Sequence, residues 1–343
     1  MEFETKSFRL ALTDALAEEM ARDRTVIILG EDVGKHGGSR GVTRGLLDKF
    51  GAERVIDSPI SEMAISGAAC GAALSGMRPV VENYMSDIIM FMSDILVTSA
   101  SNLYFATDGE MKAPMVVRGA DGSRPDGGPH QDTMAAWFAH VPGLKVIVPA
   151  TPADAKGLLK SAIRDDAPVV FFESMQLYDL EGSVPIGEHL VPIGKADVKA
   201  TGTDVTIVGV GRGVHLALAA RERWQLKGVS IEVVDLRTLR PLDRETIQKS
   251  VRKTGRLVAV HEGWASYGIG AEVLASIAEC GDVTLKAPAQ RVGTCETRLP
   301  ASLVLDSVVL PNDARLDEAI QATMVGARGA AAQRKGEALV ETR

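Results

Sequence analysis

The sequence predicts an α/β protein with two domains, each built on a sheet flanked by helices. The chain has 343 residues, which favours about two domains rather than one. Short apolar runs alternate with helical patterns, as is typical of parallel sheets covered by helices on both faces. A stretch rich in Gly, Pro and polar residues interrupts this alternation at 181–204. We therefore expect a larger domain at 1–180, a linker at 181–204, a smaller α/β domain at 205–325 and a loose tail at 326–343.

The first domain opens with a helix and continues as alternating strands and helices. Apolar residues recur at four-residue spacing from Phe8 to Met20, which predicts an amphipathic helix. The apolar run at 25–30 ends in glycine and is typical of a buried strand. Further strands are expected at 55–57, 80–84, 115–119, 145–150 and 168–173, and further helices at 61–76, 87–105 and 153–165.

The second domain repeats the alternation after the linker. The apolar run at 205–211 predicts its first strand. Glycine, alanine and charged residues dominate after the last helical pattern, and little periodicity remains there to specify structure. The remaining strands are expected at 230–236, 257–263 and 286–293, and the helices at 214–226, 243–253, 268–279 and about 313–325.

Composition excludes several classes of protein. The net charge of −7 argues against a general nucleic-acid binder, because phosphate binding needs a surplus of Lys and Arg. Cys70, Cys280 and Cys295 lie far apart, so they suggest neither a zinc site nor a disulfide framework. The first residues lack an apolar signal core, and no apolar run is long enough to span a bilayer. We expect a cytoplasmic protein with no nucleic-acid or membrane partner, although a processed organellar form would look the same.

Glu62 is the first candidate for chemistry. It follows the strand at 55–57 through a short turn and begins a helix of small, apolar residues. In parallel sheets, ligands bind beyond the carboxyl ends of the strands. One interpretation is a carboxylate that the helix dipole favours. The other is a carboxyl group in an apolar wall, where burial raises its pKa so that it exchanges a proton with a bound heterocycle.

His130 is the second candidate. It follows a Gly- and Pro-rich loop and precedes an apolar helix that ends at His140. A histidine at a helix start or an interface is the simpler interpretation, and a proton donor carried on a loop is the functional one. His140 is better explained as a positive partner for the end of the helix dipole. The glycines at 209–213 do not have the dinucleotide-binding spacing, and the sequence contains neither a phosphate-binding P-loop nor a nucleophile elbow.

Several stretches occur in the order found in one known family. They are ILGEDVG at 28–34, SPISEMAISGAACGAALSGMRPVVE at 58–82, the run from GPHQDTMAAWFAH to PVVFFE at 128–173, and VTIVGVGRG and SIEVVDLRTLRPLD after the linker. Together they resemble the beta subunit of the decarboxylating component of 2-oxo acid dehydrogenase complexes. That family includes pyruvate, branched-chain 2-oxo acid and acetoin dehydrogenases. The resemblance runs from about residue 7 to residue 325.

The resemblance implies a fold, a cofactor and roles for both candidates. It implies a transketolase-like pyrimidine-binding domain with a parallel sheet, followed by a smaller transketolase C-terminal domain. Thiamin diphosphate is expected between an alpha and a beta subunit. Glu62 matches the glutamate that hydrogen-bonds the aminopyrimidine ring and promotes its imino form. His130 matches a proton donor in the later steps, in which the acyl group passes to a lipoyl group.

Further positions carry over from the same resemblance. Ile60, Tyr84 and Ile88 match the cofactor pocket, although many family members place an aromatic ring where Ile88 stands. Four positions match backbone carbonyls that hold a structural potassium ion in some members, with plain packing as the alternative. They are Met115, Ala162, Ile163 and Asp165.

The sequence lacks the GDG motif with which thiamin-diphosphate enzymes usually hold the diphosphate and magnesium. The chain is therefore expected to be half of a site, with an alpha subunit supplying the rest in a heterotetramer of two alpha and two beta chains. A lipoyl acyltransferase core is the expected acceptor, and pyruvate the expected substrate. Acetoin or a branched-chain 2-oxo acid is the alternative. A non-catalytic scaffold is the alternative from another class, but a scaffold has no need of Glu62.

Overall fold

The computed structural model describes residues 2–123 and 130–324, and the chain divides into two compact units. The first unit comprises 1–195, 237–242 and 299–302. The second comprises 196–236, 243–298 and 303–343. The tail predicted at 326–343 lies outside the described residues. Among the described residues, no helix is both long enough and apolar enough to cross a membrane.

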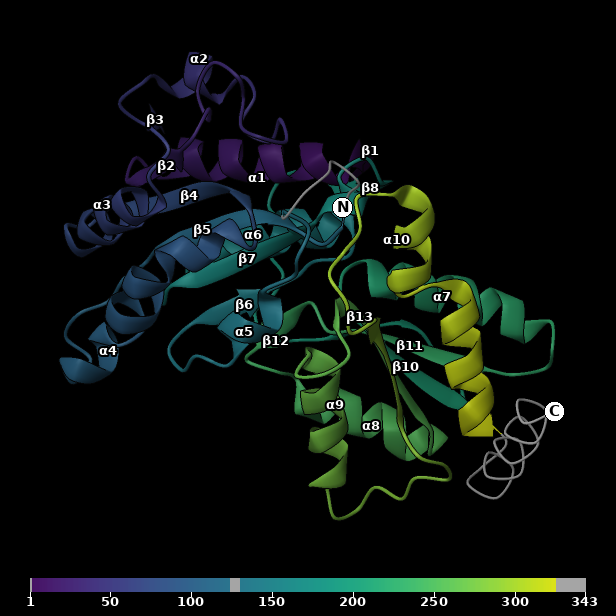
Figure 1. Cartoon of the computed structure of the whole chain (residues 1–343). Helices are drawn as coiled ribbons and strands as arrows, with labels where there is room; N and C mark the ends of the chain where they lie inside the picture. Colours follow the sequence, from purple (N-terminus) through teal and green to yellow (C-terminus); the bar gives the residue numbers. More distant parts are fainter. Residues whose placement is uncertain (1, 124–129, 325–343) are drawn as a thin grey trace. The chain divides into compact units, whose positions relative to one another are not determined.

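A seven-stranded sheet forms the centre of the first unit in the part of the chain that the structure describes (Figure 1). Its order is β12-β6-β7-β5-β4-β2-β3, and every neighbouring pair is parallel except β12 with β6. The predicted parallel sheet is therefore confirmed. The strands are β2 (Val26–Gly30), β3 (Val55–Asp57), β4 (Arg78–Met85), β5 (Val116–Asp121), β6 (Lys145–Ile147), β7 (Val169–Ser174) and β12 (Thr238–Arg240).

Helices cover this sheet where the apolar pattern of the sequence requires it. Ser7 caps the N-terminus of helix α1 (Phe8–Arg22), because its side chain accepts a hydrogen bond from the Leu10 N–H. The predicted apolar stripe of α1 is fully buried. It packs against α6 (Pro152–Arg164), which begins with a Thr151 cap and a proline in its first turn. Helix α3 (Glu62–Leu74) packs against β4. The shorter helices are α2 (Leu46–Phe50) and α5 (Ala135–Ala139), with a 3₁₀ turn at Met175–Leu177.

The prediction of one continuous helix at 87–105 is wrong. The structure has a 3₁₀ helix at Ile88–Met92, a π-helix at Asp94–Ala100 and a short α4 (Leu103–Ala106). Hydroxyl side chains compete for backbone carbonyls in this segment: Ser101 Oγ donates to Val97 O at 2.7 Å, and Thr98 Oγ1 donates to Asp94 O. This competition disturbs the regular helical ladder.

Residues 181–204, expected as a linker, contain two strands. β8 (Glu181–Pro185) pairs antiparallel with β1 (Phe3–Ser7), and β9 (Asp197–Ala200) joins the sheet of the second unit. β8 buries Val184 completely. Both strands are short and lie among Gly and Pro, so the sequence has no run of alternating residues long enough to indicate them.

The second unit has a five-stranded sheet among the described residues, in the order β14-β13-β10-β11-β9. β9 is antiparallel to β11 and the other pairs are parallel. The strand expected at 286–293 starts only at Gln290, because Pro288 has no N–H for the ladder. The elements are β10 (Val205–Gly209), α7 (Arg212–Gln225), β11 (Ile231–Asp235), α8 (Arg244–Thr254), β13 (Leu257–Trp264), α9 (Ile269–Ala278), β14 (Gln290–Thr294), α10 (Leu303–Val309) and helical residues 313–324.

Candidate functional site

The carboxyl ends of β2, β3, β4 and β5 meet at one edge of the first sheet, because these strands are parallel. The segments that follow them carry the predicted site residues. Glu31 follows β2, the turn to Glu62 follows β3, and Tyr84 stands near the end of β4. This edge is the candidate active site.

Glu62 is the first residue of α3, and its side chain is half-buried. It lies near a second carboxylate: burial, and next the charge of Glu62, raise the pKa of Glu31 above its ordinary value. The apolar residues beside Glu62 face outwards, since Ile60 is 79% exposed and Met63 is 60% exposed. Within this chain, the apolar wall expected around Glu62 is therefore open on one side.

Tyr84, Arg40 and His130 form a second group of side chains at this edge. The Arg40 guanidinium lies over the Tyr84 ring, 5.0 Å from its centroid. The Tyr84 ring meets the His130 ring edge-on, with 6.3 Å between centroids. Ile88 begins the 3₁₀ helix after β4 and packs, half-buried, against the core of the unit.

His130 is oriented by a carboxylate. Its Nδ1 lies 3.0 Å from Asp87 Oδ2, which leaves Nε2 as the other ring atom able to carry a proton outwards. The imidazole is half-exposed, so it is accessible to a second molecule. The sequence indicated His130 but gave no role to Asp87 or to Arg40. Asp87 lies just after β4, where ligand-contacting residues are expected in a parallel sheet, so position was the signal available for it.

A buried ionic network links β4, β5 and β7 within the same sheet. Arg118 bonds Glu173 through Nε at 2.6 Å and Nη2 at 2.5 Å, and it also bonds Glu82 through Nη1. Tyr178 donates to Glu173 at 2.7 Å. Burial raises the pKa of Glu82 despite the opposing charge of Arg118. Burial also disfavours the charged Arg118, but Glu173 and then Glu82 outweigh it and raise its pKa.

At the four positions matched to a potassium site, the backbone carbonyls already accept hydrogen bonds within the protein. The carbonyls of Ile163 and Asp165 accept hydrogen bonds from Arg78 Nη1 at 3.1 and 2.9 Å. The Met115 carbonyl accepts from Val169 in the sheet, and the Ala162 carbonyl accepts from Asp165 N at 3.2 Å. Among residues 2–123 and 130–324, no group of three or more His, Cys, Asp or Glu side chains could hold a metal ion.

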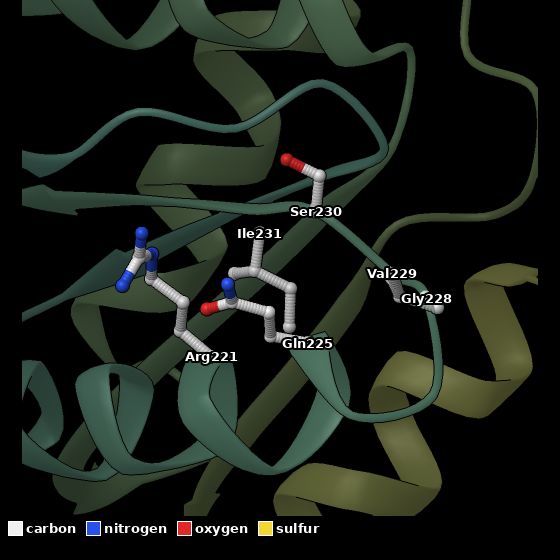
Figure 2. A pocket seen from close by; sticks show the side chains of 6 residues that line it. All are labelled: Arg221, Gln225, Gly228, Val229, Ser230 and Ile231. Atoms are coloured by element: carbon white, nitrogen blue, oxygen red, sulfur yellow. The ribbon is translucent and has the colours of Figure 1, made fainter.

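A surface cavity of about 270 Å³ lies in the second unit between the end of α7 and the start of β11 (Figure 2). It contains none of the predicted site residues, and it has one charged side chain, Arg221. Its lining is Arg221, Gln225, Gly228, Val229, Ser230 and Ile231. We assign it no role.

Comparison with known proteins adds independent information. The pyrimidine-binding domain of transketolase matches residues 4–181, and the C-terminal domain of transketolase matches residues 194–316. Among solved structures, one described as a split gene transketolase, inactive beta4 tetramer, aligns with a TM-score of 0.75 over 92% of this chain and 99% of that chain. At 23% identity, that likeness concerns the fold alone.

Curated relatives are closer in sequence. The pyruvate dehydrogenase E1 component subunit beta of Rhizobium meliloti (strain 1021) is 41% identical over 94% of this chain and 70% of its own length. The mitochondrial protein of the same description in Dictyostelium discoideum is 43% identical over 88% of this chain and 86% of its own length. The 2-oxoisovalerate dehydrogenase subunit beta of Bacillus subtilis (strain 168) is 41% identical over 91% of this chain and 96% of its own length.

Proposed function

The chain belongs to the transketolase-like family of 2-oxo acid dehydrogenase E1 beta subunits, and from that membership we propose that it forms the beta half of a thiamin-diphosphate-dependent pyruvate dehydrogenase. One observation carries the proposal. Glu62 stands half-buried at the head of α3, at the carboxyl edge of a parallel sheet, beside apolar side chains that this chain leaves exposed. A carboxyl group in such a place suits a flat heterocycle that a second chain helps to enclose.

The residues present fit the pyrimidine end of thiamin diphosphate. Ile60 and Met63 offer apolar contact, and the Glu62 carboxyl can exchange a hydrogen bond with a ring nitrogen. When bound, the cofactor supplies the electron sink for decarboxylation. Glu62 holds or releases the proton at that nitrogen, and closure by a partner would strengthen its hydrogen bond by excluding water. His130, held by Asp87, can deliver a proton from Nε2.

Exposed apolar side chains of the first unit support a protein partner. Phe91 is 64% exposed and Phe105 is 86% exposed, and both follow β4 in the first unit. Clusters of exposed large apolar side chains mark interaction sites. We propose an alpha subunit as that partner, which would supply the magnesium and diphosphate ligands, in an assembly of two alpha and two beta chains. A lipoyl acyltransferase would accept the acyl group, and the cytoplasm is the proposed location. The proposal does not extend to potassium, because the carbonyls of Ile163 and Asp165 already accept hydrogen bonds from the Arg78 guanidinium.

A branched-chain 2-oxo acid is the second candidate substrate, which the relative from Bacillus subtilis favours. Turnover of pyruvate, 2-oxoisovalerate and acetoin by the co-expressed alpha and beta chains, compared as kcat/KM, decides among the three substrates. A preference for 2-oxoisovalerate would move the enzyme to the branched-chain class, and a preference for acetoin would move it to the acetoin class.

Glu62→Gln tests the mechanism. The amide keeps the shape of the side chain but cannot take up the proton, so we expect decarboxylation to fall by at least about 100-fold while assembly with the alpha subunit stays intact. Glu110→Gln, at an exposed position of the same unit, is the matched control and should leave the rate unchanged. Near-normal decarboxylation by Glu62→Gln would show that the carboxyl group is not the activating group.

A further inference from the structure

The segment that follows β2 at the site edge is tied to two neighbouring strands. Gly34 N donates to Asp57 Oδ1 at 2.6 Å, which ties the segment to the end of β3. Ser39 N donates to Glu82 Oε1 at 2.9 Å, which ties it to β4. Residues 34–41 are therefore held against the same sheet whose carboxyl edge carries the candidate site.

Glu82 needs the hydrogen bond that this segment donates. Its side chain is 4% exposed, and its carboxylate shares the guanidinium of Arg118 with a second buried carboxylate, Glu173. One positive charge thus faces two negative charges, and buried carboxylates require further hydrogen bonds to compensate for lost water. The Tyr178 O–H donates one to Glu173 at 2.7 Å, and the Ser39 N–H donates one to Glu82. Moving the segment away would leave the buried network without one of its donors.

Gly38 allows the segment to come close enough for this hydrogen bond. Its φ is +82°, and a Cβ added there would lie 2.2 Å from Glu82 Oε1, the oxygen that accepts from Ser39. A side chain at Gly38 would therefore push the segment away from the carboxylate, in addition to the strain of a positive φ. Gly45, just before α2, has a φ of +80°, but a Cβ there would meet no atom within 4 Å outside the neighbouring residues. Comparing the two glycines separates the close approach to Glu82 from the strain of the φ.

The segment brings Arg40 to the last residues of β4. The guanidinium lies over the Tyr84 ring, 5.0 Å from its centroid, and Nη2 lies 3.5 Å from Met85 Sδ. Arg40 is thus committed to contacts within the chain, and its charge over the ring restrains the phenol. The Tyr84 ring in turn meets the His130 ring edge-on, with 6.3 Å between centroids. A series of contacts therefore connects the buried network, through this segment, with the imidazole.

We propose that Glu82 is a positioning residue for the His130 imidazole. It holds residues 34–41 against the sheet, and Arg40 of that segment holds the Tyr84 ring against the imidazole. The inference rests on the proposed function, in which His130 delivers a proton, and it adds the buried residue that keeps this proton donor in place. The effect on the rate is large, because a displacement of about 1 Å at a reacting group costs up to about 100-fold.

The first test measures amide hydrogen exchange in the co-expressed alpha and beta chains and needs no turnover. The Ser39 N–H should exchange slowly in the wild type, because it donates to a buried carboxylate. In Gly38→Ala, exchange at Ser39 should become at least about tenfold faster. In the matched control Gly45→Ala, it should stay within about threefold of the wild-type rate.

The second test compares two steps of the reaction in the same pair of chains. Gly38→Ala should slow acyl transfer to a lipoylated acyltransferase domain by about 10- to 100-fold, because the imidazole is displaced. Decarboxylation of pyruvate, followed with a dye as electron acceptor, should change by less than about threefold, because the Glu62 carboxyl group is untouched. Arg40→Met removes the charge over the ring and should slow acyl transfer by about 3- to 30-fold. Arg40→Lys keeps a cation there and should recover most of the rate, and the two Arg40 variants also cover the case in which Gly38→Ala folds poorly.

The outcomes separate this inference from the proposed function. Slow exchange at Ser39 together with normal acyl transfer in Gly38→Ala overturns the role of Glu82. Equal losses of decarboxylation and acyl transfer also overturn it, because they would mean that the segment only supports the fold. Equal slowing in Arg40→Met and Arg40→Lys contradicts the contact with the Tyr84 ring as the link. A wild-type pair that turns over no 2-oxo acid overturns the proposed function, whereas the exchange at Ser39 still reports whether Glu82 holds the segment.

Discussion

Acidification should destabilise the second unit through His261. This residue lies in β13, is 3% exposed, and packs against the glycines that begin α9. Among the described residues, its Nε2 has no hydrogen-bond partner. Burial, and next the charge of Arg291, lower the pKa of His261 from 6.5 to about 4. The folded unit therefore keeps the imidazole neutral at a pH where the unfolded chain takes up a proton.

The size of the effect follows from the two pKa values. Between pH 6.5 and about 4, the unfolded state binds more protons than the folded state, so the free energy of unfolding rises with pH and falls on acidification. At about pH 5 the unfolded imidazole is almost fully charged and the folded one is almost fully neutral. The loss relative to about pH 7.5 is then about 2 kcal/mol.

The assay compares the full chain with its His261→Gln variant by denaturant unfolding at about pH 7.5 and about pH 5. Trp224 and Trp264 lie in the second unit and Trp137 in the first, so a Trp137→Phe background makes fluorescence report on the second unit. Stability should fall on acidification by about 2 kcal/mol more in the parent than in the variant, because glutamine does not titrate. Other titrating groups cancel in this comparison. An equal pH dependence in both proteins would refute a neutral buried imidazole.

Two further changes test the core of the first unit. Arg118→Met leaves Glu82 and Glu173 buried without their cation and should lower the free energy of unfolding by about 3–5 kcal/mol. The control Arg9→Met breaks a half-exposed ion pair and should lower it by about 0–1 kcal/mol. Similar losses of stability in the two variants, measured by denaturant midpoints, would mean that the buried network contributes little. Gly143→Ala places a Cβ 2.1 Å from the Ser101 carbonyl oxygen at a φ of +86°. It should lower the melting temperature more than Gly187→Ala, where φ is +81° and no atom lies within 4 Å, and equal shifts would rule out the clash.

The sequence predicted the elements whose burial follows a local period. The stripe from Phe8 to Met20 forms α1 because each apolar residue of the stripe reaches the core. It did not predict β9 or β12, which are short and form only by pairing with strands that are distant in the sequence. The segment at 87–105 is not one continuous helix, because hydroxyl groups such as that of Ser101 donate hydrogen bonds to nearby carbonyls. Hydrophobic periodicity carries no information about this local effect.

The site was predictable to the extent that it depends on position in the chain. Glu62 begins α3 after a strand of a parallel sheet, and both facts could be read from the pattern. Arg40 lies in a Gly-rich segment without periodicity, and its contact with Tyr84 depends on the pairing of β2 with β4. The half-exposure of Glu62 depends on how its neighbours pack, which the spacing of apolar residues does not specify.

The strand β12 limits how this chain can be divided or recombined. Residues 237–242 belong to the first unit, although the chain on either side of them belongs to the second. A fragment ending near residue 195 would lack β12 and leave the hydrogen-bonding edge of β6 open to pairing with other molecules. Hybrids that exchange the C-terminal half between family members must therefore keep residues 237–242 matched to the N-terminal half. A hybrid with a single junction near residue 195 that does not do so is expected to aggregate.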